Sequence, residues 1–145
     1  MDIRLAEKSD LEQLLPLYSQ LHDSMPIFDK SSEKIWDDIL RDKNHYVIAG
    51  LIDNKIVSSC VILIVPNLTY YGRPYALIEN VITDESYRGN GYAAQCLDYA
   101  REIAKENRCY KPAQVKRTGF ISGQDTTKMI RQHLYNGLIN CCVFP

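Results

Sequence analysis

The sequence has almost no net charge, and this limits the partners that we expect for it. Its 145 residues include 17 Lys and Arg against 18 Asp and Glu, which leaves a formal net charge of −1. Such a charge gives no general attraction to the phosphates of nucleic acid. No apolar run reaches the length of a membrane span, and the N-terminal residues do not resemble a secretory signal peptide. We therefore expect a cytoplasmic protein that binds neither nucleic acid nor a membrane.

The chain also lacks cysteines in the spacing of a zinc or redox motif. No two of the five are separated in the C-x-x-C pattern that is typical of zinc and redox sites. An odd number of cysteines without a secretion signal indicates reduced thiols rather than disulfides. We therefore expect no metal. The five are Cys60, Cys96, Cys109, Cys141 and Cys142.

The chain has the length of one domain, and we predict a single domain over residues 1–145. A short strand is expected at residues 2–6. It is followed by a helix with a capping box of Ser9 and Glu12, and by a second helix capped by Ser31 or Ser32. Apolar runs predict strands at 46–52, 55–65 and 75–83, with a hairpin turn at Asp53-Asn54. Helical periodicity that begins at Ala93 predicts a last helix, which follows a glycine loop and ends near Asn107.

Glycine is scarce, yet two of the seven glycines stand in Arg88-Gly89-Asn90-Gly91-Tyr92-Ala93. A strand followed by a short glycine loop and a helix presents unpaired backbone N–H groups to an anion. Gly89, Gly91 and Ala94 also fit the dinucleotide fingerprint G-x-G-x-x-A. That fingerprint normally follows its strand directly, whereas about five residues intervene here. A third interpretation is a glycine turn that only begins a helix.

The order of elements, together with this loop, resembles the GCN5-related N-acetyltransferase (GNAT) superfamily. Arg88, Gly91 and Ala93 match its acetyl-CoA motif Gln/Arg-x-x-Gly-x-Gly/Ala, and residues 78–83 resemble its central strand. The resemblance covers roughly residues 1–111. It implies an α+β fold with a mixed, mostly antiparallel central sheet flanked by helices.

The resemblance also implies how acetyl-CoA would bind as co-substrate. The strand residues would pair their backbone with the pantetheine arm, and the loop would hold the pyrophosphate. The residues implied in the strand are Val81, Ile82 and Thr83, and those in the loop are Arg88, Gly89, Asn90, Gly91, Tyr92 and Ala93.

The activity implied is transfer of an acetyl group to a primary amine by direct attack in a ternary complex. Glu79 is the candidate base, since burial in an apolar strand favours the neutral form of a carboxylate and makes the ionised form a better proton acceptor. It could instead pair with a basic neighbour or face solvent. Tyr70, Tyr71 and Tyr75 either line an acceptor pocket or serve only in packing.

We expect the acceptor to be a small-molecule or peptide amine, whose identity the sequence does not indicate. The sequence also does not decide whether the protein forms a homodimer. A second functional hypothesis is a CoA-binding or regulatory module without catalytic turnover.

The resemblance fails after Lys111. The family continues with a strand that ends in Thr-Gly and a helix whose Phe-Tyr pair can protonate the departing thiolate. This chain continues with a polar segment that begins at Pro112, so the C-terminal strands are altered. Tyr135 and His133 are the titratable candidates for the missing acid, and residues 138–144 could add one strand.

Back-translation of residues 113–138 in a shifted frame yields a family-like tail with Thr-Gly, an aromatic pair and Ala-Gly-Tyr. We therefore hypothesise a frameshift after about residue 111, which sequencing of the coding DNA decides. An alternative frame without such a tail would refute it.

Overall fold

The computed structural model describes residues 1–21, 29–110 and 114–115. These residues build a five-stranded sheet in the order β1-β2-β3-β4-β5, in which only the β4–β5 pair is parallel. The strands are β1 (Asp2–Leu5), β2 (His45–Ile52), β3 (Lys55–Val65), β4 (Tyr75–Thr83) and β5 (Gln114–Val115). The expected α+β fold with a mixed, mostly antiparallel sheet is confirmed.

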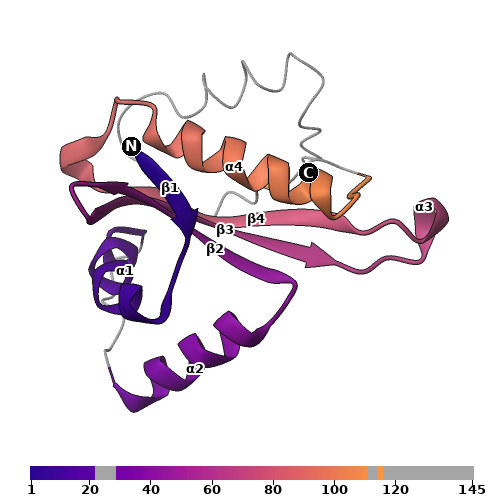
Figure 1. Cartoon of the computed structure of the whole chain (residues 1–145), viewed down its shortest axis with the longest axis horizontal. Helices are drawn as coiled ribbons and strands as arrows, with labels where there is room; N and C mark the ends of the chain where they lie inside the picture. The colour runs from indigo at the N-terminus through magenta and orange to yellow at the C-terminus, as the bar shows by residue number, and fades with distance from the viewer. Residues whose placement is uncertain (22–28, 111–113, 116–145) are drawn as a thin grey trace, which may run out of the picture.

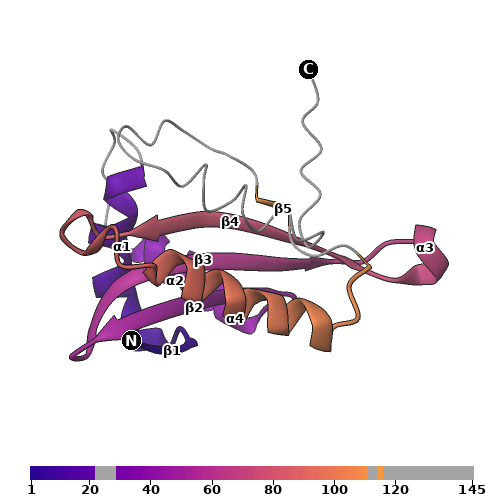
Figure 2. The ribbon, with the colours of Figure 1, turned by 90° about the horizontal axis from the view of Figure 1, so that it is seen from above.

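Helices cover both faces of this sheet. Helix α4 lies on one face, and α1 and α2 lie on the other (Figure 1). Seen from above, α4 lies across the strands, and the end of the β3–β4 hairpin that carries α3 projects past the other strands (Figure 2). The α-helices are α1 (Leu11–Tyr18), α2 (Lys30–Arg41), α3 (Thr69–Gly72) and α4 (Tyr92–Glu106), and the 3-10 turns are η1 (Lys8–Asp10), η2 (Ser19–Leu21) and η3 (Glu85–Tyr87).

Alternating side chains of the strands divide the core into two layers, because successive residues of a strand point to opposite faces. Under α4 the layer contains Ile48, Cys60, Ile62, Ile78, Cys96, Leu97 and Ala100, among others. Under α1 and α2 it contains Leu14, Leu17, Trp36, Val47, Ala49, Val61 and Ile82, among others.

The predicted turn at Asp53-Asn54 is confirmed, whereas both predicted helix caps are wrong. Asp53 and Asn54 have φ values of 49° and 63°, as the two central residues of a type I′ turn require. Before α1, the backbone N–H of Glu7 donates to Asp10 Oδ2 at 2.7 Å, so Asp10 takes the place expected for Ser9 and Glu12. Asp29 caps α2 by accepting from the N–H of Ser32, at 2.9 Å.

Arg4 and Asp10 join β1 to the start of α1. Arg4 Nη1 and Nη2 donate to the two carboxylate oxygens of Asp10 at 2.5 and 2.9 Å, and Asp10 is 3% exposed. The hydrogen bonds from Arg4 hold the pKa of the Asp10 carboxyl below its usual 3.8.

Arg4→Met should lower the free energy of unfolding by about 1–3 kcal/mol at pH 7, because it removes two hydrogen-bond donors from the buried Asp10 carboxylate, while the Arg4 side chain itself is partly exposed to solvent. Since the folded-state pKa of Asp10 is depressed, the stabilisation is present above pH 3.8 and is lost as the pH falls through the depressed value. Urea unfolding at neutral pH and near pH 2 measures both effects. The control is Arg41→Met, which removes only exposed ion pairs on α2 and should cost less than about 1 kcal/mol. An equal loss for Arg4→Met at both pH values would contradict the assignment.

Candidate active site

A β-bulge at Asn80 interrupts the pairing of β4 with β3. Ile82 pairs with Ser59 and Glu79 pairs with Val61, so Asn80 and Val81 together oppose Cys60. Asn80 adopts a left-handed φ of 51°, which asparagine tolerates better than most residues. The bulge was not predicted, and its signal in the sequence is an asparagine inside a largely apolar strand.

The bulge lies where the outer edge of β4 becomes open. Strand β5 pairs only with Leu77 and Ile78. Beyond them, residues 79–83 have no strand on that edge within the part of the chain that the structure describes. An extended ligand could therefore pair with this edge as an added strand does.

The glycine loop follows this open edge and leads into α4. Gly89 and Gly91 have φ values of 82° and 74°, which non-glycine residues rarely adopt. Gly91 is the N-cap of α4 and offers no side chain to its first turn. Among residues 1–21 and 29–110, the backbone N–H groups of residues 89–93 have no acceptor. These groups are therefore available to an anion at the positive end of the helix dipole.

Two side chains of the loop stabilise its conformation by donating hydrogen bonds to nearby backbone carbonyls. Arg88 Nε donates to the carbonyl of Thr83 at 3.1 Å, and its terminal nitrogens have no acceptor among the described residues. The side-chain amide of Asn90 donates to the carbonyls of Tyr87 and Arg88 at 3.0 and 3.3 Å. Asn90 therefore closes the loop, while Arg88 keeps part of its guanidinium for an anion.

Ser58 of β3 holds the end of β4 through hydrogen bonds of its side chain. It is fully buried, and its hydroxyl donates to the carbonyl of Ile82 at 2.9 Å. The same oxygen lies 2.9 Å from the hydroxyl of Thr83. A serine in an apolar strand was the available signal, but its partners depend on the register with β4.

Glu79 is half-buried on the face of the sheet that α1 and α2 cover. It pairs with Val61, whose side chain belongs to the layer under these two helices. Directly opposite residues of an antiparallel pair point to the same face. No basic side chain of the described residues forms an ion pair with Glu79. The carboxylate therefore lies beside the bulge, without a counter-charge from the described residues.

Tyr18 lies on the same face but is not suited to accept a proton. Its hydroxyl is 3.3 Å from Ser59 Oγ, and burial raises the pKa of the phenol to about 12. It therefore stays protonated at neutral pH.

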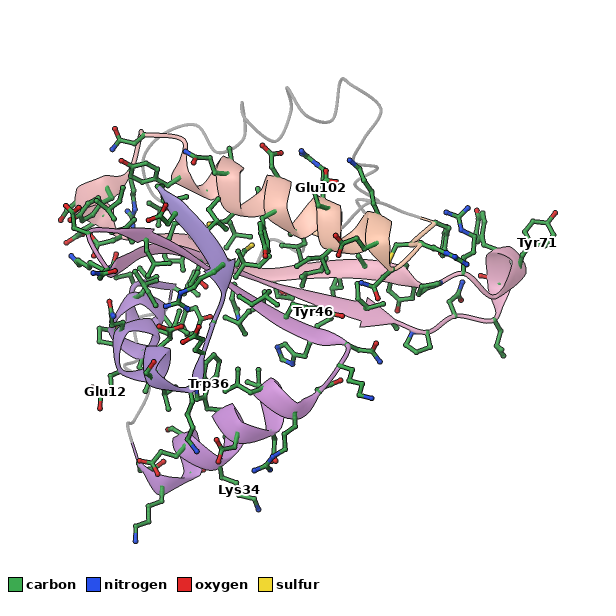
Figure 3. The ribbon with its side chains drawn as sticks, in the orientation of Figure 1. Glu12, Lys34, Trp36, Tyr46, Tyr71 and Glu102 are labelled. Carbon is green, nitrogen blue, oxygen red and sulfur yellow. The ribbon has the colours of Figure 1, made fainter. Side chains whose placement is uncertain are left out.

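Tyr70 and Tyr71 do not line a pocket near Glu79. They lie in α3 at the tip of the β3–β4 hairpin, where Tyr71 is fully exposed and points away from the molecule (Figure 3). The ring of Tyr70 stacks on Tyr110 with centroids 4.0 Å apart. Tyr75 begins β4, four positions before Glu79 and at the hairpin end of the strand.

Three candidates lie outside the described residues, namely Tyr135, His133 and the strand at 138–144. The described residues contain no group of three or more His, Cys, Asp or Glu side chains that could hold a metal ion. Within the same residues, every helix is too short or too polar to cross a membrane.

The profile of the Acetyltransferase (GNAT) family matches residues 11–119. The chain belongs to the GNAT acetyltransferase family. The match begins in α1 and includes the bulged strand and the glycine loop. This GNAT protein is therefore an acyltransferase, and its family uses acetyl-CoA as co-substrate.

Relatives of this GNAT protein agree with the assignment. The chain is 30% identical over 119 residues to the glucosamine 6-phosphate N-acetyltransferase of Trypanosoma brucei brucei. The aligned region covers 77% of this chain and 76% of the relative. A solved structure of a putative acetyltransferase from Agrobacterium tumefaciens is 31% identical, with a TM-score of 0.82 over 100% of this chain and 98% of that one. The glucosamine-6-phosphate N-acetyltransferase of Arabidopsis thaliana shares the fold at 18% identity, with a TM-score of 0.81 over 99% of this chain and 95% of that one.

Proposed function

We propose that this GNAT protein transfers an acetyl group from acetyl-CoA to a primary amine within a ternary complex. The observation that carries the proposal is the continuity of two binding features. The open, bulged edge of β4 runs directly into a loop whose backbone N–H groups have no acceptor among the described residues. An extended arm that ends in a pyrophosphate needs this combination.

The loop residues would hold the pyrophosphate. Gly89, Asn90, Gly91, Tyr92 and Ala93 supply N–H donors, and the terminal nitrogens of Arg88 add positive charge. The pantetheine arm would pair with the backbone of residues 81–83, which Ser58 fixes in place. Each helix-end contact contributes about 0.3–1 kcal/mol, so the loop and the strand are both needed for useful affinity.

The chemistry requires a neutral amine. Its nitrogen attacks the acetyl carbonyl carbon, the C–N bond forms, and the C–S bond to coenzyme A breaks. Glu79 accepts the proton of the amine directly or through water, because no basic side chain of the described residues neutralises its carboxylate. The thiolate takes up a proton as it leaves. Tyr135 stays the predicted donor.

The first acceptor to test is glucosamine 6-phosphate, because the trypanosomal relative is named for that substrate. Glucosamine without the phosphate, amino acids and N-terminal peptides complete the panel.

The test combines calorimetry with acetyl-CoA and a thiol-release assay on the full chain. We expect binding of acetyl-CoA and release of coenzyme A that depends on one of the amines. Binding without turnover on any amine would favour the alternative, a CoA-binding module, and absence of binding would refute both.

A further inference from the structure

The segment that leads into the glycine loop is tied to the rest of the protein at its first residues. The N–H of Asp84 donates to the carbonyl of Val57 at 2.9 Å, and the carbonyl of Asp84 accepts from the N–H of Tyr87 at 2.8 Å. The Asp84 carboxylate caps η3 through the N–H of Ser86, at 3.0 Å. From Arg88 to Gly91 every residue is exposed. The position of the loop therefore depends on η3 together with the hydrogen bond from Arg88 to Thr83.

Lys55 reaches η3 from another part of the chain. Its ammonium lies 3.7 Å from Asp84 Oδ2 and 4.9 Å from the centre of the Tyr87 ring. It therefore joins the residue before η3 to the last residue of η3 through an ion pair and a cation–π contact.

The turn that carries Lys55 is itself fixed. Gln13 of α1 accepts from the N–H of Ile56 at 2.9 Å, and its side-chain amide donates to the carbonyl of Asn54 at 3.4 Å. Lys55 thus extends from a turn that α1 holds, rather than from a free hairpin end.

We propose that Lys55 is a positioning residue for the acetyl-CoA loop. It fixes the ring of Tyr87, and the carbonyl of Tyr87 accepts the hydrogen bond by which Asn90 closes the loop. Lys55 also neutralises the carboxylate of Asp84, which would otherwise repel a pyrophosphate nearby. This inference rests on the proposed function, because it assigns a cause to the geometry of that same site.

The experiment compares Lys55→Met with the wild-type chain. We expect Lys55→Met to weaken acetyl-CoA binding about three- to ten-fold, the effect expected for one exposed ion pair and one cation–π contact. The KM for acetyl-CoA should rise by the same factor, with kcat unchanged. Hydrogen exchange of the backbone N–H groups of Tyr87 and Arg88, which donate to the carbonyls of Asp84 and Glu85, should be several-fold faster without any ligand. Lys55→Arg should restore the affinity for acetyl-CoA, the KM and the rate of hydrogen exchange, since a guanidinium can pair with Asp84 and stack on Tyr87.

Two further variants separate this role from a loss of surface charge. Lys34→Met is the matched control, because Lys34 is an exposed lysine of α2 (Figure 3) that forms no ion pair with the described residues. It should change neither binding nor exchange. In a Tyr87→Leu background, the additional effect of Lys55→Met should be smaller than in the wild type, because one of its two contacts is already absent.

The possible outcomes distinguish this inference from the proposed function. If the wild type binds acetyl-CoA and Lys55→Met binds it equally well, the positioning role is wrong while the function stands. If Lys55→Met loses affinity but its ligand-free exchange is unchanged, Lys55 contacts the ligand directly, and the positioning role is again wrong. If the wild type does not bind acetyl-CoA, the proposed function fails, and exchange alone decides whether Lys55 positions the loop.

Discussion

Gly91→Val should reduce the affinity for acetyl-CoA about 100-fold, or by roughly 3 kcal/mol. Gly91 has a φ of 74°, a conformation that is unfavourable for a β-branched residue. Either valine keeps this conformation and projects its side chain beside the N–H donors, or the loop relaxes and the donors move away. A Cβ at this position meets no atom of the described residues within 4 Å, so a clash with these residues would not cause the loss. Calorimetry with acetyl-CoA measures the change.

Gly72→Val is the matched control. Gly72 has a φ of 73°, and a Cβ there also meets no atom of the part of the chain that the structure describes within 4 Å. It lies in α3 at the hairpin tip, at the other end of β4 from the loop (Figure 2). Both variants should therefore lower Tm by similar amounts, while only Gly91→Val loses affinity. Equal affinity of the two variants for acetyl-CoA would remove the loop from the binding site.

Glu79→Gln should lower kcat about 100-fold or more, which is the typical contribution of a positioned general base. The glutamine keeps the size of the side chain but does not accept a proton from the amine. Acetyl-CoA affinity should stay within about two-fold, since the loop and the strand backbone are unchanged. Steady-state kinetics with the acceptor found in the panel, together with calorimetry, separate the two effects.

Glu12→Gln provides the comparison for this variant. Glu12 is an exposed carboxylate on the outer side of α1 (Figure 3), and it forms no ion pair with the described residues. Its substitution should leave kcat and Tm unchanged. A Glu79→Gln protein with wild-type kcat would show that the proton leaves by another route.

Local sequence patterns were sufficient to predict the main elements. The apolar runs at 46–52, 55–65 and 75–83 fall within strands, and helical periodicity placed α4 within one residue of its end. Asp53-Asn54 predicted its turn because both residues tolerate a positive φ. The caps were mistaken because several polar residues compete near each helix start. Which of these residues caps the helix depends on the direction from which the chain enters its first turn.

The sequence by itself determined the strands, the last helix and the glycine loop, because periodicity and turn chemistry depend on residues that are close together in the chain. Only the tertiary structure decided the bulge at Asn80, the face on which Glu79 lies, and the contact of Lys55 with Asp84 and Tyr87. These features depend on the register of β3 against β4. That register is set by packing under helices on both faces of the sheet, which involves residues far apart in the chain.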